Sequence, residues 1–326
     1  MMNVTVLGAG GWGLALALTL CANGHNVTVW SPFSEEVQQL QTVRANEHLL
    51  PGVKIDSNIS VTDDISVSSR ADVIVMATPS FAIRQTAARL KEHNPCGIVV
   101  SVAKGLENGT LLRLSQVIKQ ELPNNVVTVL SGPSHAEEVA RGIPTMLTVS
   151  GGNEAARKTV QRLFSNDFLR VYTNHDVIGA ELGGAIKNVI AVAAGVCDGM
   201  GLGDNSRAAL ITRGLAEMTR LGAALGAEPS TFSGLTGMGD LIVTCTSVHS
   251  RNHRFGELVG KGVDIQTALT KVGTVEGYYA CKMAYELACK YNVDMPITEL
   301  CYKLLYEGYS VDGIVKTLMT RPFKAE

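Results

Sequence analysis

The sequence predicts an α/β domain with a doubly wound, mostly parallel sheet, followed by an all-helical domain. Over the first half of the chain, short apolar runs rich in β-branched residues alternate with helical periodicity, as in parallel sheets covered by helices on both faces. After about residue 174 only helical spacing remains. A length of 326 residues fits two domains, and 46% hydrophobic against 18% charged residues provides enough apolar side chains for two cores.

In the first domain, expected strands alternate with expected helices. The strands are 4–7, 27–30, 73–77, 98–102, 126–130 and 146–149, and the helices are 12–23, 81–92 and 111–121. This order is that of a doubly wound sheet, in which helices connect parallel strands. We therefore place the first domain at residues 1–174 and the second at 175–326.

The second domain is expected to begin with one long helix over residues 176–197. Ala and Gly dominate this run, but Glu181, Lys187 and Asn188 interrupt it. Because these polar side chains lie in the middle of the run, we interpret it as a buried core helix and not as a membrane span. Helical spacing then recurs at 206–225, 255–260, 265–269, 278–291, 296–306 and 311–319.

Charge and cysteine usage exclude several classes of partner. The 28 Lys and Arg residues against 30 Asp and Glu residues give a net charge of −2, so we expect no nucleic-acid or membrane-surface partner. Seven cysteines without C-x-x-C spacing predict buried free thiols in a reducing cytoplasm, with no disulfide framework and no metal. The apolar stretch 14–20 lacks the basic flank of a signal peptide, because the first basic residue is Arg44.

Three glycines with the spacing G-x-G-x-x-G follow the first expected strand and open the first expected helix. Gly8 would permit a tight turn, Gly10 would let the backbone approach a pyrophosphate, and Gly13 would allow close helix–strand packing. The alternative is a glycine-rich turn without a ligand. The strand before the motif and the helix after it favour a Rossmann-like site for NAD or NADP, with the phosphates at the helix N-terminus.

The end of the second expected strand bears on the choice of coenzyme. An NAD-selective fold usually has Asp or Glu here, to bind the 2′-hydroxyl of the ribose. Residues 30–33 read Trp-Ser-Pro-Phe and contain neither an acid nor an Arg, while Glu35 and Glu36 follow on an expected helix. The missing acid removes repulsion of a 2′-phosphate, so NADP is permitted, and the sequence leaves the preference open.

Two further positions lie at carboxyl ends of strands, where ligands bind in open α/β sheets. Residues 78–81 (Thr-Pro-Ser-Phe) form either a second nucleotide-facing segment or an ordinary turn that starts a helix. Lys104 follows the strand 98–102 and precedes a glycine. Its alternatives are a ligand-facing ammonium and a solvated loop lysine.

Lys187 lies inside the helical run 176–197, which is rich in small and apolar residues. An ammonium in such surroundings must be paired or functional. Gly183, four residues earlier, shares its face and would leave space for a ligand. We favour a catalytic lysine, with a structural ion pair to Glu181 or another acid as the alternative.

A carboxylate and a basic cluster follow in the second domain. Asp240 is expected in a glycine turn over residues 237–241. Arg251 with Ser250 and Asn252 precedes an expected helix and would form a phosphate clamp. The alternative for this cluster is a solvated, capped helix start.

Taken in order, these segments resemble the bacterial-type NAD(P)-dependent glycerol-3-phosphate dehydrogenases nearly end to end. The residues that carry the resemblance are 8–13, 101–107 (SVAKGLE), 131–136 (SGPSHA), 183–188 (GGAIKN), 235–241 (LTGMGDL), 250–252 (SRN) and 274–277 (TVEG). The resemblance implies reversible hydride transfer between NAD(P)H and dihydroxyacetone phosphate, giving sn-glycerol 3-phosphate for phospholipid synthesis in the cytoplasm.

Residue by residue, the resemblance implies that Lys187 donates or accepts the proton, with Lys104 and Asp240 in the same catalytic set. The substrate side would consist of Lys104, Gly132, Ser134, Lys187, Asn188, Asp240, Thr244, Ser250, Arg251 and Asn252. Together with the glycine motif and the strand ends, the coenzyme side would consist of Gly8, Gly10, Gly11, Trp12, Gly13, Pro32, Pro79, Phe81, Lys104, Ala136, Arg251, Thr274 and Glu276. The sequence departs from the family at 31–32, where many relatives carry a basic residue.

Two other functions compete with this one. The first is another two-domain dehydrogenase, acting on a β-hydroxyacid or on phosphogluconate. The Ser-Arg-Asn segment after Gly-Met-Gly-Asp favours a small phosphate ester instead. The second is a non-catalytic NAD(P)-sensing protein, which would have no reason to keep Lys104, Lys187, Asp240 and Arg251 together. The sequence leaves the oligomeric state open, with a homodimer among the alternatives.

Overall fold

The computed structural model describes residues 1–323 and divides into two compact units, Met1–Glu181 and Leu182–Glu326. The division falls inside the long helix α7 (Val177–Gly199), whereas the sequence analysis placed the boundary before that helix, at residues 174 and 175. The last three residues of the second expected domain, 324–326, lie outside the described residues.

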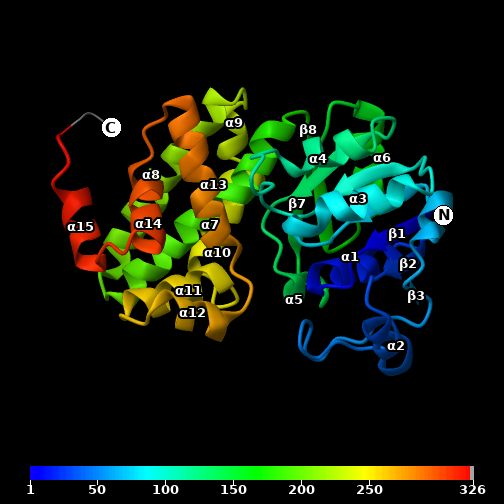
Figure 1. Cartoon of the computed structure of the whole chain (residues 1–326). Helices are drawn as coiled ribbons and strands as arrows, with labels where there is room; N and C mark the ends of the chain where they lie inside the picture. Colours follow the sequence, from blue (N-terminus) through cyan, green and yellow to red (C-terminus); the bar gives the residue numbers. More distant parts are fainter. Residues whose placement is uncertain (324–326) are drawn as a thin grey trace. The chain divides into compact units, whose positions relative to one another are not determined.

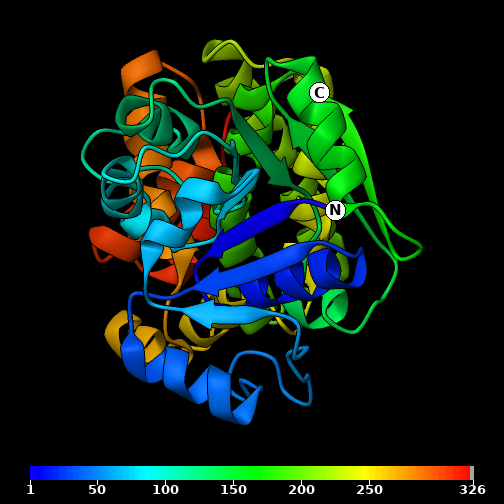
Figure 2. The same ribbon diagram turned by 90° about the vertical axis from the view of Figure 1, so that its right-hand side faces the viewer.

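Within the described chain, the first unit contains an eight-stranded sheet with the order β3-β2-β1-β4-β5-β6-β7-β8. Its strands are β1 (Asn3–Leu7), β2 (Asn26–Trp30), β3 (Ser60–Thr62), β4 (Val73–Met76), β5 (Ile98–Ser101), β6 (Val127–Ser131), β7 (Thr145–Ser150) and β8 (Leu169–Asn174). The pair β6–β7 is antiparallel and the other neighbouring pairs are parallel. The fold class predicted from the sequence, mostly parallel and doubly wound, is confirmed. Figure 2 shows the paired blue strands β1 and β2 side by side.

Two strands were not expected from the sequence, and both lie at edges of the sheet. β3 spans only Ser60–Thr62, too short for an apolar run. β8, Leu169–Asn174, alternates buried with exposed residues over its first half and includes Arg170 and Tyr172 on its exposed side. An edge strand that is covered on one face carries no continuous apolar signal.

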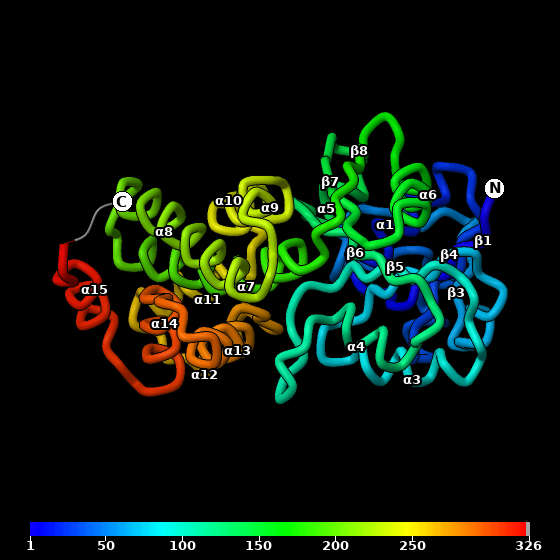
Figure 3. Tube along the Cα trace, turned by 90° about the horizontal axis from the view of Figure 1, so that it is seen from above, coloured from blue at the N-terminus to red at the C-terminus, as the bar shows by residue number. Residues whose placement is uncertain are grey.

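Helices cover both faces of the sheet. The helices of this unit are α1 (Gly11–Ala22), α2 (Ser34–Val43), α3 (Ile83–Lys91), α4 (Leu114–Glu121), α5 (Ala136–Val139) and α6 (Glu154–Phe164). One apolar layer joins α1 and α6 to the sheet, and a second joins α3 and α4 to the opposite face. Figure 3 shows α3 and α4 on one side of the strands and α6 on the other. The helix expected from residue 111 starts later, because Leu111 has φ +60°.

The described part of the second unit is helical, as expected (Figure 1). After α7 come α8 (Gly203–Ala224), α9 (Pro229–Phe232), a π-helical turn (Leu235–Gly239), α10 (Asp240–Thr246), α11 (Arg251–Gly260), α12 (Ile265–Val272), α13 (Glu276–Tyr291), α14 (Pro296–Tyr306) and α15 (Val311–Met319). The expectation that Asp240 lies in a glycine turn is wrong. It is the first residue of α10, and the glycines before it belong to the π-helical turn.

The helix α7 is buried along most of its length. It is the one helix among the described residues that is long and apolar enough to cross a membrane by length and composition, and 89% of its most apolar window is buried in the protein. Burial on all sides explains why its composition is apolar all round, as the sequence analysis inferred.

The prediction of buried free thiols is correct in part. All seven cysteines are free, and Cys197, Cys245, Cys281 and Cys301 are buried. Cys96 and Cys289 are exposed and Cys21 is half-buried, so the prediction is wrong for these three. The general preference of cysteine for the interior does not decide the position of each individual side chain.

Candidate active site

The glycine motif forms the turn between β1 and α1 at the point where the strand order reverses. Gly8 has φ +119°, and a Cβ there would lie 2.8 Å from the backbone of Ala77, directly after β4. A Cβ at Gly13 would lie 2.1 Å from the carbonyl oxygen of Gly8. Both positions therefore require glycine for close packing, as the sequence predicts.

Gly10 differs from these two glycines because a Cβ there would meet nothing within 4 Å. Gly10 is also the N-cap of α1, where the first amides of the helix have no partner inside the helix. Open space at an uncapped helix N-terminus fits a pyrophosphate, which would accept hydrogen bonds from those amides. The residues of this turn thus fit a dinucleotide.

Neighbouring elements bring other predicted coenzyme residues to this turn. A Cβ at Gly11 would lie 3.7 Å from the Cβ of Ala136, the first residue of α5. Trp12, half-buried, packs against the same core. The amide of Gly8 donates to the Trp30 carbonyl at 2.9 Å, which places the end of β2, followed by the exposed Pro32, beside the motif.

The segment after β4 lies at the same edge of the sheet. Pro79 is the N-cap of a short 3₁₀ turn (Ser80–Ala82), and Phe81 in that turn is 78% exposed. An exposed aromatic ring beside the glycine motif is consistent with a nucleotide-facing segment.

Lys104 follows β5, and its ammonium is held by the segment that follows β6. Its Nζ donates to the Gly132 carbonyl and to the Ser134 hydroxyl, each at 3.0 Å. Gly132 has φ +137°, a conformation that favours glycine and turns its carbonyl toward the lysine. The structure therefore brings together three residues that the sequence analysis expected on the substrate side, from the segments that follow two neighbouring strands.

Lys187 is 5% exposed on α7 and contacts two residues of α10. Its Nζ lies 2.5 Å from Oδ1 of Asp240 and 2.7 Å from the Thr244 hydroxyl, which in turn donates to the Asp240 carbonyl at 2.6 Å. An ammonium so deep in the protein needs this compensation. Lys187, Asp240 and Thr244 thus form one hydrogen-bonded group, which we call the lysine site.

Glu181, which the sequence analysis considered as the ion-pair partner of Lys187, has other partners. Its carboxylate accepts from the Arg113 guanidinium at 2.6 Å, and from the Ser115 amide and hydroxyl at 2.7 and 2.6 Å. It therefore binds the first turn of α4 and not the lysine. A helical spacing of six residues puts Glu181 and Lys187 on different faces of α7.

The expectation that Gly183 leaves space for a ligand is wrong. A Cβ at Gly183 would lie 2.4 Å from the carbonyl oxygen of Thr236. The backbone of the π-helical turn fills the space, and this close approach brings Asp240, the next residue after that turn, to Lys187. Because Gly183 has no side chain, the π-helical turn can approach α7 closely, and this approach positions the Asp240 carboxylate.

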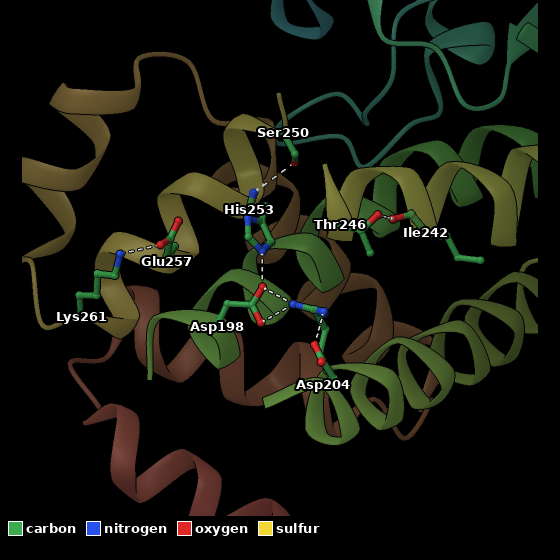
Figure 4. Close-up of polar contacts among 9 residues, drawn as sticks. Asp198, Asp204, Ile242, Thr246, Ser250, His253, Glu257 and Lys261 are labelled. Atoms are coloured by element: carbon green, nitrogen blue, oxygen red, sulfur yellow. Dashed lines mark hydrogen bonds and ion pairs between the residues drawn. The ribbon is translucent and has the colours of Figure 1, made fainter. Parts of the chain in front are cut away.

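The N-terminus of α11 carries the Ser-Arg-Asn segment. Ser250 caps the helix, because its hydroxyl accepts from the His253 amide at 3.2 Å (Figure 4). Arg251 is exposed at the first helical position. This combination of an anion-favouring helix end and an exposed guanidinium suits a phosphate. Ser250 is also the helix cap, as the alternative interpretation of this segment expected.

Asn252 is buried and joins three helices. Its side-chain amide donates to Oδ1 of Asn188 on α7 at 2.9 Å, and its Oδ1 accepts from the Gly277 amide in α13 at 2.8 Å. Glu276, half-buried, opens α13, and the exposed Thr274 precedes it. The segments GGAIKN, SRN and TVEG of the sequence therefore meet in the second unit.

Sequence reasoning missed the support behind the α11 cap. His253 Nε2 lies 2.8 Å from Asp198 Oδ2, and both Asp198 oxygens accept from Arg207 at 3.0 Å (Figure 4). The cluster ties α11 to the last turn of α7 and to α8. Only the i+3 spacing of His253 from Ser250 signals it in the sequence, and such spacing is common.

A buried thiol follows directly after Thr244 of the lysine site. Burial raises the pKa of Cys245, next to Thr244 on α10, to about 12. The thiol is therefore neutral near pH 7 and does not act as a nucleophile beside the lysine site.

Comparisons with known proteins agree with this arrangement. Residues 3–157 match the family model for the NAD-dependent glycerol-3-phosphate dehydrogenase N-terminus, and residues 176–316 match that for the C-terminus. The chain is 52% identical to glycerol-3-phosphate dehydrogenase [NAD(P)+] of Bacillus pumilus over 98% of its length and 95% of the relative's. It is 49% identical to that of Clostridium perfringens, covering 100% of this chain and 99% of the relative.

Solved structures give the same result. Glycerol-3-phosphate dehydrogenase from Coxiella burnetii superposes with a TM-score of 0.94 and 37% identity, over 98% of this chain and 99% of that one. The enzyme from Saccharomyces cerevisiae gives 0.85 and 27%, over 97% and 99%. The chain belongs to the NAD-dependent glycerol-3-phosphate dehydrogenase family.

Proposed function

We propose that the chain catalyses reversible hydride transfer between NAD(P)H and dihydroxyacetone phosphate, giving sn-glycerol 3-phosphate. The observation that carries the proposal is the lysine site, a buried ammonium fixed by Asp240 and Thr244. Reduction of a ketone leaves a developing alkoxide, which needs a proton and a positive charge beside it. Lys187 provides both in one group.

Each member of the lysine site has its own role. Lys187 donates its proton to the substrate oxygen during reduction and accepts it in the reverse direction. Asp240 and Thr244 fix the direction of the ammonium and balance its charge, so that no reorganisation is needed during the reaction. The coenzyme, when bound, supplies the hydride that reduces the ketone carbon.

The remaining residues bind and orient. Arg251, at the N-terminus of α11, pairs with the substrate phosphate, and Asn252 and Asn188 form the buried wall beside it. Lys104, with Gly132 and Ser134, contributes a second ammonium on the substrate side. Binding energy from the phosphate then fixes the carbonyl relative to the nicotinamide.

We further infer that residues 1–174 form the dinucleotide-binding domain and 175–326 the helical domain with the lysine site, while Lys104, Gly132 and Ser134 of the first segment also contribute to the substrate side. Of the predicted coenzyme residues, those in the first of these segments are Gly8, Gly10, Gly11, Trp12, Gly13, Pro32, Pro79, Phe81, Lys104 and Ala136. We place the reaction in the cytoplasm, where its product would supply glycerophospholipid synthesis. The proposal requires neither a metal nor a nucleic acid, and a homodimer stays an alternative for the assembled form.

A coenzyme-by-substrate activity matrix tests the function. Purified protein is mixed with NADH or NADPH and with dihydroxyacetone phosphate, a β-ketoacid or a sugar phosphate, and the loss of the coenzyme's near-ultraviolet absorbance is followed. Oxidation of the coenzyme with dihydroxyacetone phosphate, and not with the other two substrates, supports the proposal. Turnover of a hydroxyacid or phosphogluconate in the reverse direction would favour the other dehydrogenase classes, and coenzyme binding without any turnover would favour a sensing protein.

A further inference from the structure

The end of β2 is the part of a dinucleotide site that faces the 2′ position of the adenosine ribose. In this chain the glycine motif fixes where that position is, because the Gly8 amide donates to the carbonyl of Trp30, the last residue of β2. Ser31 follows directly and is 1% exposed. The side chains that surround Ser31 therefore decide which ribose the site accepts.

An acid does reach this place, although it does not come from the strand. The Ser31 hydroxyl donates to Oε2 of Glu36, and it accepts from the Phe33 amide at 3.3 Å. Glu36 is in the first turn of α2 and is half-buried. The helix α2 begins four residues after β2 ends, and the carboxylate of Glu36 in its first turn contacts Ser31 at the strand end.

A second acid lies close by. β3 runs parallel to β2 with Thr62 opposite Trp30, so that Asp63 follows the end of β3. The carbonyl of Asp63 accepts from the Trp30 indole at 3.0 Å, and its carboxylate accepts from the Ser34 hydroxyl at 2.5 Å. Two carboxylates, from Glu36 and Asp63, therefore surround the end of β2.

One cation lies near the same strand end. The guanidinium carbon of Arg89, on α3, is 5.1 Å from the centre of the Trp30 ring. The Trp30 side chain belongs to the apolar layer under α3 and α4, whereas Ser31 contacts the first turn of α2. Arg89 is thus placed against the ring and not against the hydroxyl that binds Glu36.

We propose that Glu36, oriented by Ser31, selects the unphosphorylated ribose, so that the site prefers NAD(H) to NADP(H). A carboxylate here accepts hydrogen bonds from ribose hydroxyls and repels a 2′-phosphate. This inference rests on the proposed function, since it assumes the dinucleotide site. It also replaces the expectation from the sequence that this strand end lacks an acid.

Direct binding tests the proposal without relying on turnover. Dissociation constants are measured by calorimetry for NADH, NADPH, ADP and 2′,5′-ADP. The unmodified protein is expected to bind ADP at least about tenfold more tightly than 2′,5′-ADP, and NADH more tightly than NADPH. Glu36→Gln keeps an acceptor for Ser31 but removes the charge, and it should reduce both ratios by about tenfold.

Glu35→Gln is the matched control, because Glu35 is in the same turn, is exposed and carries the same charge. It should leave both ratios unchanged. Tighter binding of 2′,5′-ADP than of ADP, unchanged ratios in Glu36→Gln, or an equal change in Glu35→Gln would overturn the proposal. A loss of NADPH affinity in Arg89→Met, without such a loss in Glu36→Gln, would also overturn it, because Arg89 would then be the residue that binds the 2′-phosphate.

The outcomes separate this inference from the proposed function. If NADH and NADPH bind equally and both support reduction of dihydroxyacetone phosphate, only the role of Glu36 fails. If neither coenzyme binds, the proposed function fails with it.

Discussion

The two units present their candidate residues in opposite ways. At the glycine motif of the first unit the important property is the absence of side chains, since Gly8 and Gly13 permit close packing and Gly10 leaves a helix N-terminus open. In the lysine site of the second unit it is the presence of charged side chains, since Lys187 and Asp240 are 5% and 1% exposed. The first unit therefore offers backbone dipoles to an anion, and the second offers a proton.

This difference determines how each unit responds to mutation. A side chain added to open space at the glycine motif would block a ligand without disturbing the fold. A charge removed from the lysine site would leave its partner buried without compensation, which costs about 3–5 kcal/mol. Binding and stability are thus separable in the first unit and coupled in the second.

The largest effect is expected at the lysine site. Lys187→Met should reduce kcat by about 10²–10⁴, the usual contribution of general acid–base catalysis, while NADH affinity is nearly unchanged. The variant should also melt at a lower temperature, because the Asp240 carboxylate loses its counter-charge. Steady-state kinetics, fluorescence titration with NADH and thermal melting measure the three quantities.

A double variant separates catalysis from stability at this site. Lys187→Met with Asp240→Asn removes both charges and should recover much of the lost melting temperature. It should not recover kcat, because no group is left to transfer the proton. Near-normal kcat in the folded fraction of either variant would show that Lys187 is a structural partner only.

The second effect concerns coenzyme binding at the glycine motif. Gly10 has φ −65° and ψ 168°, a conformation that valine adopts, and a Cβ there meets no atom within 4 Å. Gly10→Val should therefore melt as the unmodified protein does but lose NADH affinity by about a hundredfold, because the side chain occupies the place of the pyrophosphate.

Gly13→Val provides the contrast within the same motif. Its Cβ would lie 2.1 Å from the Gly8 carbonyl oxygen, so this variant should be strongly destabilised. Unchanged NADH affinity in Gly10→Val would disprove the assignment of the motif to the phosphates. A Gly10→Val protein that melts as early as Gly13→Val would disprove the separation of binding from folding.

The sequence predicts the backbone features of the protein better than the side-chain contacts. The glycine motif could be found because a strand, a turn and a helix constrain the spacing of Gly8, Gly10 and Gly13. Lys187 could be found because an ammonium is conspicuous in an apolar helix. Its partner Asp240 was expected in the same catalytic set from the family resemblance, but the turn that positions it was not recognised as π-helical.

Two failures have one physical cause. Gly183 was interpreted as ligand space, and the end of β2 as free of acid. In each case another segment occupies the position: the Thr236 backbone, far along the chain, in one, and the Glu36 carboxylate, from the helix that follows the strand, in the other. A sequence shows which side chain is missing at a position, but not which neighbour replaces it, because that depends on packing.

A third effect concerns the N-terminus of α11. Arg251→Ala should raise KM for dihydroxyacetone phosphate by about 10–100-fold, which corresponds to the loss of one charge-assisted hydrogen-bonded pair. It should also lower coenzyme affinity, because the resemblance implies that Arg251 contacts the coenzyme as well. Arg254→Ala is the matched control, since Arg254 is an exposed arginine one turn later on the same helix. Equal changes in KM for both variants, or none for Arg251→Ala, would place the phosphate elsewhere.

The smallest effect is expected at Glu107 of the first unit, which forms a partly exposed ion pair with Arg84. Glu107 lies three residues after Lys104, and Arg84 donates to its two oxygens at 2.6 and 2.8 Å. These hydrogen bonds hold the pKa of Glu107 below its ordinary value of 4.5. A carboxyl group whose pKa is lower in the folded state stabilises the protein above its unfolded pKa, and this contribution disappears as the pH falls through the folded value.

Glu107→Gln should therefore lower the free energy of unfolding at pH 7 by no more than about 1 kcal/mol, because the Arg84 side chain is 37% exposed and solvent screens the pair. The difference between the two proteins should shrink as the pH is lowered from about 6 to about 3, since Glu107 then becomes neutral in both states. Urea unfolding at several pH values measures it, with Glu154→Gln, an exposed acid paired with Lys158 on α6, as the control that should show no measurable change. A difference that grows toward low pH would contradict the sign of the shift. A loss at pH 7 as large as that expected for Lys187→Met would show that charge in the first unit is as deeply coupled to folding as it is in the second, and the contrast between the units would fail.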